Sequence, residues 1–136
     1  MEFDPTRDYP LGARRPELVT TPGGTPLAEV TLAAAREGRL HGDDLRATPE
    51  TLRRQADVAR ASGRRQLAEN LERAAELAAI PDRELLEIYT ALRPGRSTAG
   101  ELEAWAERLD ALDAHRTAAF VREAAEVYAE RRLLVR

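Results

Sequence analysis

The sequence contains no cysteine and no lysine, and only 4% of its residues are aromatic. The absence of cysteine excludes disulfides, thiolate catalysis and cysteine-based metal sites. No apolar stretch approaches the ~20 residues that a membrane helix needs, and the first residues lack the basic and apolar regions of a secretory signal. We therefore expect a cytoplasmic protein that does not bind a membrane.

Charge of one sign is nowhere concentrated along the chain. The net charge is −3, and all 21 basic residues are arginines. We interpret this use of arginine, together with 25 alanines, mainly as a bias towards GC-rich codons. The arginines alternate with acids along each expected helix, whereas nucleic-acid binding needs positive charge clustered on one face. We expect no nucleic-acid partner.

Reactive side chains are also scarce. His41 and His115 are the only histidines, and each has aspartates nearby but no recognised ligand motif. The two serines, Ser62 and Ser97, have no base placed to activate them. We expect no catalytic, cofactor-binding or metal-ligating residue on this chain.

The first 30 residues differ from the rest. Five of the eight prolines and three of the eight glycines precede residue 27, so this segment cannot form a long helix or a central strand. Residues 1–30 are predicted to be an extended N-terminal arm, and its apolar side chains argue against a free linker. Two positions for it remain open, over its own domain or over another subunit.

Residues 31–136 are predicted to form a compact helical domain, a bundle of about five helices with no sheet. Capping hydroxyls, prolines and glycines mark the helix ends. Apolar residues recur at helical spacing between these marks, so Tyr89 and Trp105 are expected in the core. The expected starts and stops are Thr48-Pro49, Gly63, Pro81, Pro94, Thr98 with Glu101, and about Ala114.

Alanine occupies many of the inward-facing positions. An alanine removes little apolar area from water, and at ~25 cal/mol per Å² such a stripe contributes much less than leucine or phenylalanine. We expect the isolated chain to be marginally stable and to gain stability from a partner.

The segment Arg93-Pro94-Gly95-Arg96 places two guanidinium groups on either side of a rigid turn. Guanidinium groups bind carboxylates in a bidentate manner, so the turn suits a neighbouring acidic surface. A solvated loop explains the same residues equally well.

Many collinear segments together resemble one family, the small subunit of adenosylcobalamin-dependent diol and glycerol dehydratases. The resemblance covers most of the chain, although Leu71 and Gly95 stand where phenylalanine and tyrosine are expected. The matching segments are Asp8 to Leu11, Asp44 to Leu52, Ala61 to Arg64, Asn70 to Leu77, Leu86 to Ser97 and Phe120 to Ala125, with Tyr128.

The resemblance implies a holoenzyme that is a dimer of heterotrimers with large, medium and small subunits. This enzyme would be a carbon–oxygen lyase that dehydrates 1,2-propanediol to propionaldehyde, or glycerol to 3-hydroxypropionaldehyde, by a radical mechanism. Adenosylcobalamin would be bound by the other subunits, and no cofactor or metal by this chain. Such enzymes are often enclosed in bacterial microcompartments, and the sequence decides neither encapsulation nor the preferred diol.

On this interpretation the chain braces the catalytic large subunit without taking part in the chemistry. The candidate subunit interface comprises Tyr9, Pro10, Leu11, Arg93 and Arg96. The alternative is a free-standing helical adaptor or regulatory protein with no enzymatic role.

Overall fold

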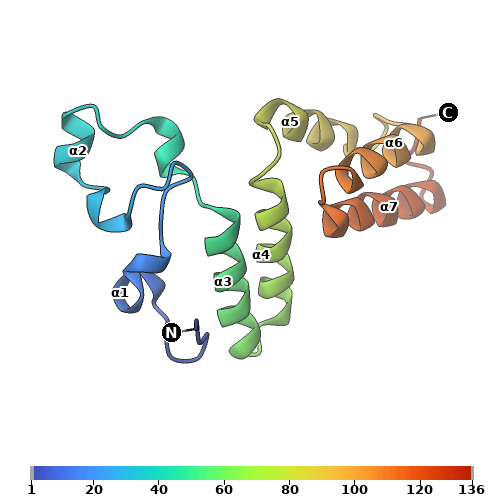
Figure 1. The fold of residues 1–136 in the computed structure, drawn as a ribbon. Helices are drawn as coiled ribbons and strands as arrows, with labels where there is room; N and C mark the ends of the chain where they lie inside the picture. The colour runs from blue at the N-terminus through green and yellow to red at the C-terminus, as the bar shows by residue number, and fades with distance from the viewer. Residues whose placement is uncertain (1, 136) are drawn as a thin grey trace. The chain divides into compact units, whose positions relative to one another are not determined.

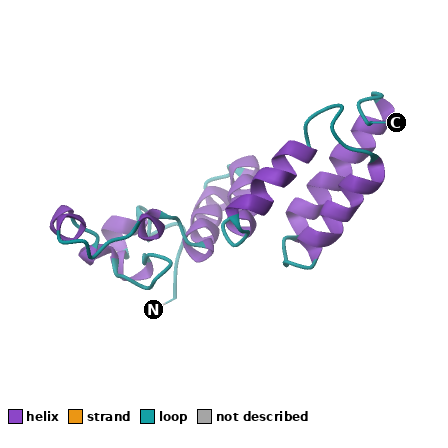
Figure 2. Cartoon of the chain, turned by 90° about the horizontal axis from the view of Figure 1, so that it is seen from above, coloured by secondary structure: helices purple, strands orange, loops and turns teal. Residues whose placement is uncertain are grey.

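The fold is helical throughout the part of the chain that the computed structural model describes, residues 2–135 (Figure 1). These residues contain seven α-helices, three short 3-10 helices and no β-strand. Figure 2 shows helices joined by loops. The prediction of an all-α fold is confirmed. Five of the α-helices have ten or more residues, namely α3 (Pro49–Ala61), α4 (Arg65–Leu77), α5 (Asp82–Ala91), α6 (Ala99–Asp110) and α7 (His115–Glu130).

The chain divides into two compact units, Met1–Ala78 and Ala79–Arg136. The first contains the N-terminal segment and the α3–α4 pair, and the second contains α5, α6 and α7. The boundary expected from the sequence, at residue 30, separates an arm from a helical domain and does not coincide with the boundary between the two units. It stays a prediction.

In the first unit, α3 and α4 form an antiparallel hairpin (Figure 1). Thr48 caps α3 by accepting a hydrogen bond from the amide of Thr51, and Pro49 occupies the first helical position. Gly63 lies at φ +75°, a left-handed conformation that ends the helix and turns the chain into α4. These local signals explain why the predicted start and stop agree with the structure.

The contact between α3 and α4 is built from small side chains. Ala56, Ala59 and Ala68 are buried, and Leu71 packs against them half-buried. The small residues let the two helices approach closely but remove little apolar area from water. Arg60 of α3 adds an ion pair to Glu72 of α4 at 3.1 Å.

The N-terminal segment is not uniformly extended, because it contains one turn of α-helix, α1 (Leu11–Arg14), and two 3-10 helices, Pro16–Leu18 and Leu27–Glu29. It lies against its own unit: the guanidinium of Arg54 on α3 donates to the carbonyl oxygen of Leu18 at 2.7 Å. The arm therefore contacts α3 of its own chain, and a contact of its exposed residues with another subunit stays a prediction.

A short helix, α2 (Leu32–Arg36), follows, and the hydroxyl of Thr31 caps it as expected. Gly38, at φ +71°, comes just after this helix, where a left-handed residue favours a stop. A single 3-10 turn, Gly42–Leu45, then leads to α3.

The second unit has larger side chains in its interior. Leu102 and Leu109 of α6 and Val121 of α7 are almost completely buried. Thr98 and Glu101 form the predicted capping box at the start of α6.

Ion pairs join the helices of the second unit at its surface. Arg108 of α6 makes two hydrogen bonds to the carboxylate of Glu84 on α5, at 2.8 and 3.1 Å. Arg122 of α7 bonds Glu103 and Asp110 of α6, both at 2.8 Å. These exposed pairs fix the pairing of helices more than they add stability.

One expectation about the core is wrong. Tyr89 was expected on the buried side of α5, but it is 56% exposed. Ile88 is the residue of this stripe that is buried, while Leu85 and Leu92 are half-buried. Tyr89 lies one position further round the helix, on the side of Leu86, and so faces away from the interior.

Candidate subunit interface

The arm presents Tyr9 at the surface. Tyr9 is 57% exposed and Pro10 is exposed as well. The peptide bond between them is cis. Leu11, the third candidate contact of the arm, is only 5% exposed and packs within its own unit. The structure therefore leaves Tyr9 and Pro10, but very little of Leu11, accessible to another molecule.

A shallow hollow of about 300 Å³ is lined by Tyr9 on one side and by the α3–α4 hairpin on the other. Its apolar lining comes from Tyr9, Val58, Leu67 and Leu71, with polar groups at the rim. Leu67 is 44% exposed. The hollow and Tyr9 together form an accessible apolar area on the first unit.

Asp8 holds the base of the arm in place. Its side chain is buried, accepts a hydrogen bond from the amide of Asp4 at 3.0 Å, and pairs with Arg15 at 2.6 Å and Arg7 at 3.1 Å. The amide of Asp4, followed by the two guanidinium groups, lowers the pKa of Asp8 to about 2. A carboxylate with this set of donors stays ionised and fixes the backbone next to Tyr9.

The turn between α5 and α6 is held at several points by its own unit. The amide of Gly95 donates to the carbonyl oxygen of Leu133 at 2.7 Å, and Gly95 has φ +72°. The hydroxyl of Ser97 donates to the carbonyl oxygen of Ala91 at 2.9 Å, so Ser97 fastens the turn instead of capping α6. The backbone that carries the two arginines is thus fixed.

The side chains of Arg93 and Arg96 are exposed, and neither makes a hydrogen bond or ion pair within residues 2–135. Two acids that are close to them in the sequence are engaged elsewhere. Glu87 pairs with Arg83 at 3.2 Å, and Glu101 accepts from the amide of Thr98 at 2.8 Å. Positive charge at this turn is therefore not neutralised by the neighbouring acids.

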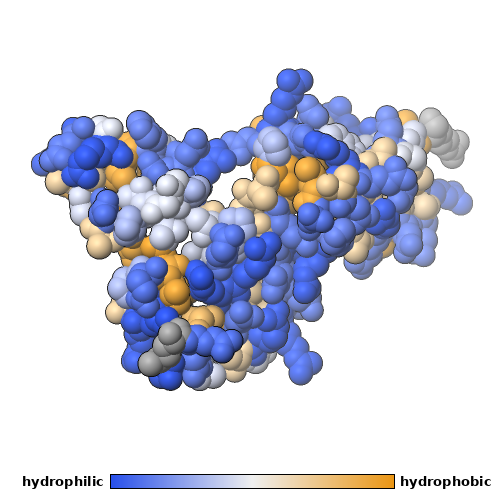
Figure 3. Space-filling model, viewed as in Figure 1, coloured by the Kyte–Doolittle hydropathy of each residue, from blue (hydrophilic) through white to orange (hydrophobic). Residues whose placement is uncertain are grey.

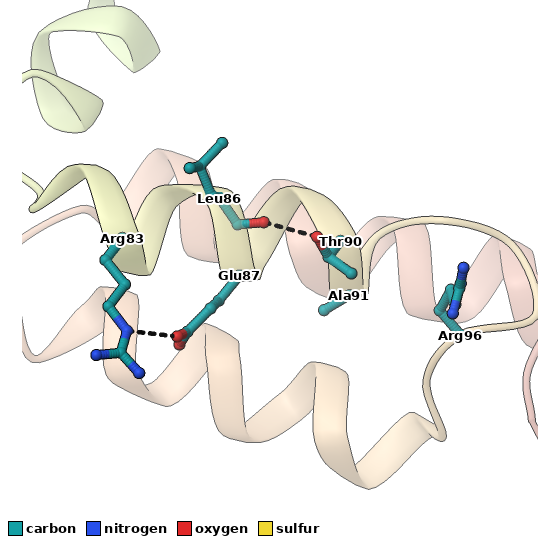
Figure 4. Close-up of a pocket in the computed structure, with 6 residues that line it drawn as sticks. All are labelled: Arg83, Leu86, Glu87, Thr90, Ala91 and Arg96. Carbon is teal, nitrogen blue, oxygen red and sulfur yellow. Dashed lines mark hydrogen bonds and ion pairs between the residues drawn. The ribbon is translucent and has the colours of Figure 1, made fainter.

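A second hollow lies along the outer side of α5, with a volume of about 670 Å³ (Figure 4). Its lining comes from one helix and the turn that follows, and it mixes apolar and charged side chains. The residues that line it are Arg83, Leu86, Glu87, Thr90, Ala91 and Arg96.

Hydrophobic residues reach the surface near α5 and beside α1 on the face that Figure 3 shows. On α5 the exposed apolar residues are Leu86, at 66%, and Tyr89, at 56%. From the sequence, Arg93 and Arg96 were predicted as contacts, but Leu86 and Tyr89 were not. The available signal was that a ten-residue helix carries apolar residues on two sides, and only one side can face its own interior.

The two histidines lie on different segments of the chain. His41 is exposed, and Nδ1 of His115 lies 2.8 Å from a carboxylate oxygen of Asp110. Within residues 2–135, no three histidine, aspartate or glutamate side chains gather closely enough to hold a metal ion. No histidine is among the residues that line the hollow beside α5.

Between residues 2 and 135, none of the helices combines the length and the apolar character that crossing a bilayer would require.

Comparison with known proteins agrees with a helical subunit of a larger enzyme. A family model described as the dehydratase small subunit matches residues 5–135. The chain belongs to the dehydratase small-subunit family.

Two relatives are propanediol dehydratase small subunits, from Citrobacter freundii and from Salmonella typhimurium. Each is 51% identical to this chain over 128 residues, which cover 93% of this chain and 74% of the relative. Both names describe a part of a multi-subunit enzyme.

Proposed function

We propose that this chain is the non-catalytic small subunit of a propanediol dehydratase, which removes water from 1,2-propanediol to give propionaldehyde. The observation that carries the proposal is the 51% identity to two propanediol dehydratase small subunits over nearly the whole chain. These names favour propanediol over glycerol as the substrate of the assembled enzyme.

In this proposal the chemistry belongs to the large and medium subunits, assembled as a dimer of heterotrimers. Adenosylcobalamin, bound by those subunits, would supply the radical that starts the reaction. The enzyme would act in the cytoplasm, free or inside a microcompartment.

The role of this chain is to brace its sister subunits through surfaces that its own fold leaves uncovered. Two such areas are present: exposed Tyr9 and Pro10 on the first unit, and Arg93 and Arg96 on the second. Leu11 serves as the anchor that positions Tyr9, because its own side chain is buried. The small alanine core of the α3–α4 hairpin supports the same role, since a marginally stable unit gains from burial against a partner.

Co-expression of this chain with affinity-tagged large and medium dehydratase subunits tests the proposal. Native mass spectrometry should show a complex that contains all three chains, and the complex with added adenosylcobalamin should form propionaldehyde from 1,2-propanediol. Omitting this chain should lower the yield of soluble complex. Recovery of the same soluble, active enzyme without it would contradict a bracing role.

A variant pair then tests the arm. Tyr9→Ala should reduce recovery of this chain with the tagged subunits, whereas Leu45→Ala, at an exposed leucine elsewhere on the first unit, should not. A free-standing adaptor would be indicated if the wild-type chain never joined the complex.

A further inference from the structure

Helix α5 carries an uncovered apolar stripe next to an uncompensated positive turn. Leu86 and Tyr89 are three positions apart on the helix and are both more than half exposed. Leu86 also lines the hollow of about 670 Å³, and Arg96 lines the same hollow from the turn (Figure 4). We call Leu86, Tyr89, Arg93 and Arg96 the α5 face.

The charges around this face are arranged asymmetrically. Glu84 is bound by Arg108 at 2.8 Å, and Glu87 is bound by Arg83 at 3.2 Å. Glu84 and Glu87 therefore each have an arginine partner, while Arg93 and Arg96 have no acidic partner within residues 2–135. An occupant of the face must bring negative charge to the end of α5 and apolar side chains to its middle.

The turn that carries the arginines is organised before any partner arrives. The carbonyl oxygen of Leu92 accepts from the hydroxyl of Tyr128 at 2.6 Å, and the amide of Gly95 bonds Leu133. A fixed backbone lowers the entropy lost on binding, and guanidinium groups suit the bidentate capture of carboxylates. These properties are those of a docking surface.

We propose that the α5 face binds a sister dehydratase subunit through a segment that places an apolar side chain against Leu86 and Tyr89 and a carboxylate against Arg96. The proposal rests on the proposed function, because it takes its partner from the assembled enzyme. It assigns Leu86 and Tyr89 to the interface and gives Arg93 and Arg96 a ligand, the side-chain carboxylate of Asp or Glu.

A second copy of this chain fits the face less well. At a symmetric contact, Arg93 and Arg96 of one copy would lie close to the same two arginines of the other copy. Glu84 and Glu87 of each copy are already paired with other arginines. A free inorganic anion would satisfy the arginines but leave Leu86 and Tyr89 in water.

Co-purification with tagged large and medium subunits, measured at several salt concentrations, tests the proposal in the whole complex. Leu86→Ser and Arg96→Glu should each lower recovery of this chain by at least about tenfold, the effect of losing an interface hot spot. Matched controls are Leu32→Ser, at a leucine that is 67% exposed against 66% for Leu86, and Arg53→Glu, at an exposed arginine of α3. Neither control should change recovery by more than about twofold.

Salt separates the charged contact from the apolar one. Recovery of the wild-type chain should fall as ionic strength rises, and this dependence should be weaker for Arg96→Ala, which lacks the charge. Circular dichroism of the separate variants should show unchanged helicity, because all the changed side chains are exposed.

A photo-reactive amino acid in place of Leu86 identifies the occupant. Cross-linking to a sister subunit, at a peptide that contains Asp or Glu, is the expected result. Cross-linking to a second copy of this chain, or equal recovery of the Leu86→Ser, Arg96→Glu and wild-type chains, would overturn the α5 face while leaving the proposed function intact. Failure of the wild-type chain to join the complex would instead remove the proposed function and this inference together.

Discussion

The hydroxyl of Tyr128 on α7 donates a hydrogen bond of 2.6 Å to the carbonyl oxygen of Leu92, the residue that directly follows α5. The two residues are 36 positions apart, and the bond ties the last helix to the turn that carries Arg93. The carbonyl groups at a helix end lack partners within their own helix, so the tyrosine satisfies an acceptor that would otherwise need water.

Replacing Tyr128 by Phe should lower the free energy of unfolding by about 1 kcal/mol, because one half-buried hydrogen bond is lost. Urea denaturation followed by circular dichroism measures the change. Tyr89→Phe is the matched control, since the hydroxyl of Tyr89 makes no hydrogen bond within residues 2–135. Equal effects of the two substitutions would show that the bond to Leu92 contributes nothing.

The buried carboxylate of Asp8 should make stability depend on pH. Its pKa in the folded chain is lowered to about 2, and that of an unfolded aspartate is about 4. The ionised group therefore stabilises the fold above about pH 4, and this contribution is lost as the pH falls towards 2. Asp8→Asn should be less stable than wild type at pH 7, and the difference should shrink steadily below pH 4. Thermal melts across this range check it, with Asp43→Asn, at a side chain that is 89% exposed, as control.

Two glycines should respond in opposite directions to substitution by alanine. Gly63 has φ +75°, and the position where a Cβ would be added is open, so Gly63→Ala introduces only backbone strain and should destabilise by about 1 kcal/mol. Gly100 lies in the first turn of α6 with equally open space, and Gly100→Ala should stabilise by up to about 1 kcal/mol. Urea midpoints of the two variants that move in the same direction would refute the conformational explanation.

Tight packing between α3 and α4 should make Ala56 intolerant of larger side chains. Ala56 has no exposed surface, so Ala56→Leu should cost about 1–3 kcal/mol through overpacking. Ala61, at the end of the same helix, is exposed, and Ala61→Leu should change stability by less than about 0.5 kcal/mol. A tolerated leucine at position 56, judged by an unchanged melting temperature, would mean that the hairpin is loosely packed.

The helices themselves were predictable from the sequence because residues close to each helix end determine where it begins or stops. Thr48 with Pro49 starts α3, Thr98 with Glu101 starts α6, and Gly63 ends α3, each by interactions within a few residues. Such signals need no knowledge of the tertiary structure.

The surfaces were less predictable, because exposure depends on which helices pack together. Periodicity placed Tyr89 in the core, since spacing alone does not say which side of a ten-residue helix is covered. The pairing of charges is equally non-local: Arg108 reaches Glu84, 24 positions away, while Arg96 reaches no acid in the described chain. The sequence identified the arginine turn, and the structure added its apolar neighbours.

The segment that follows α7 holds the arginine turn through two backbone hydrogen bonds. The carbonyl oxygen of Leu133 accepts from the amide of Gly95, and the amide of Val135 donates to the carbonyl oxygen of Ser97. Removal of residues 133–135 would release the amide of Gly95 and the carbonyl of Ser97 together. A chain that lacks these residues would then hold the turn less firmly.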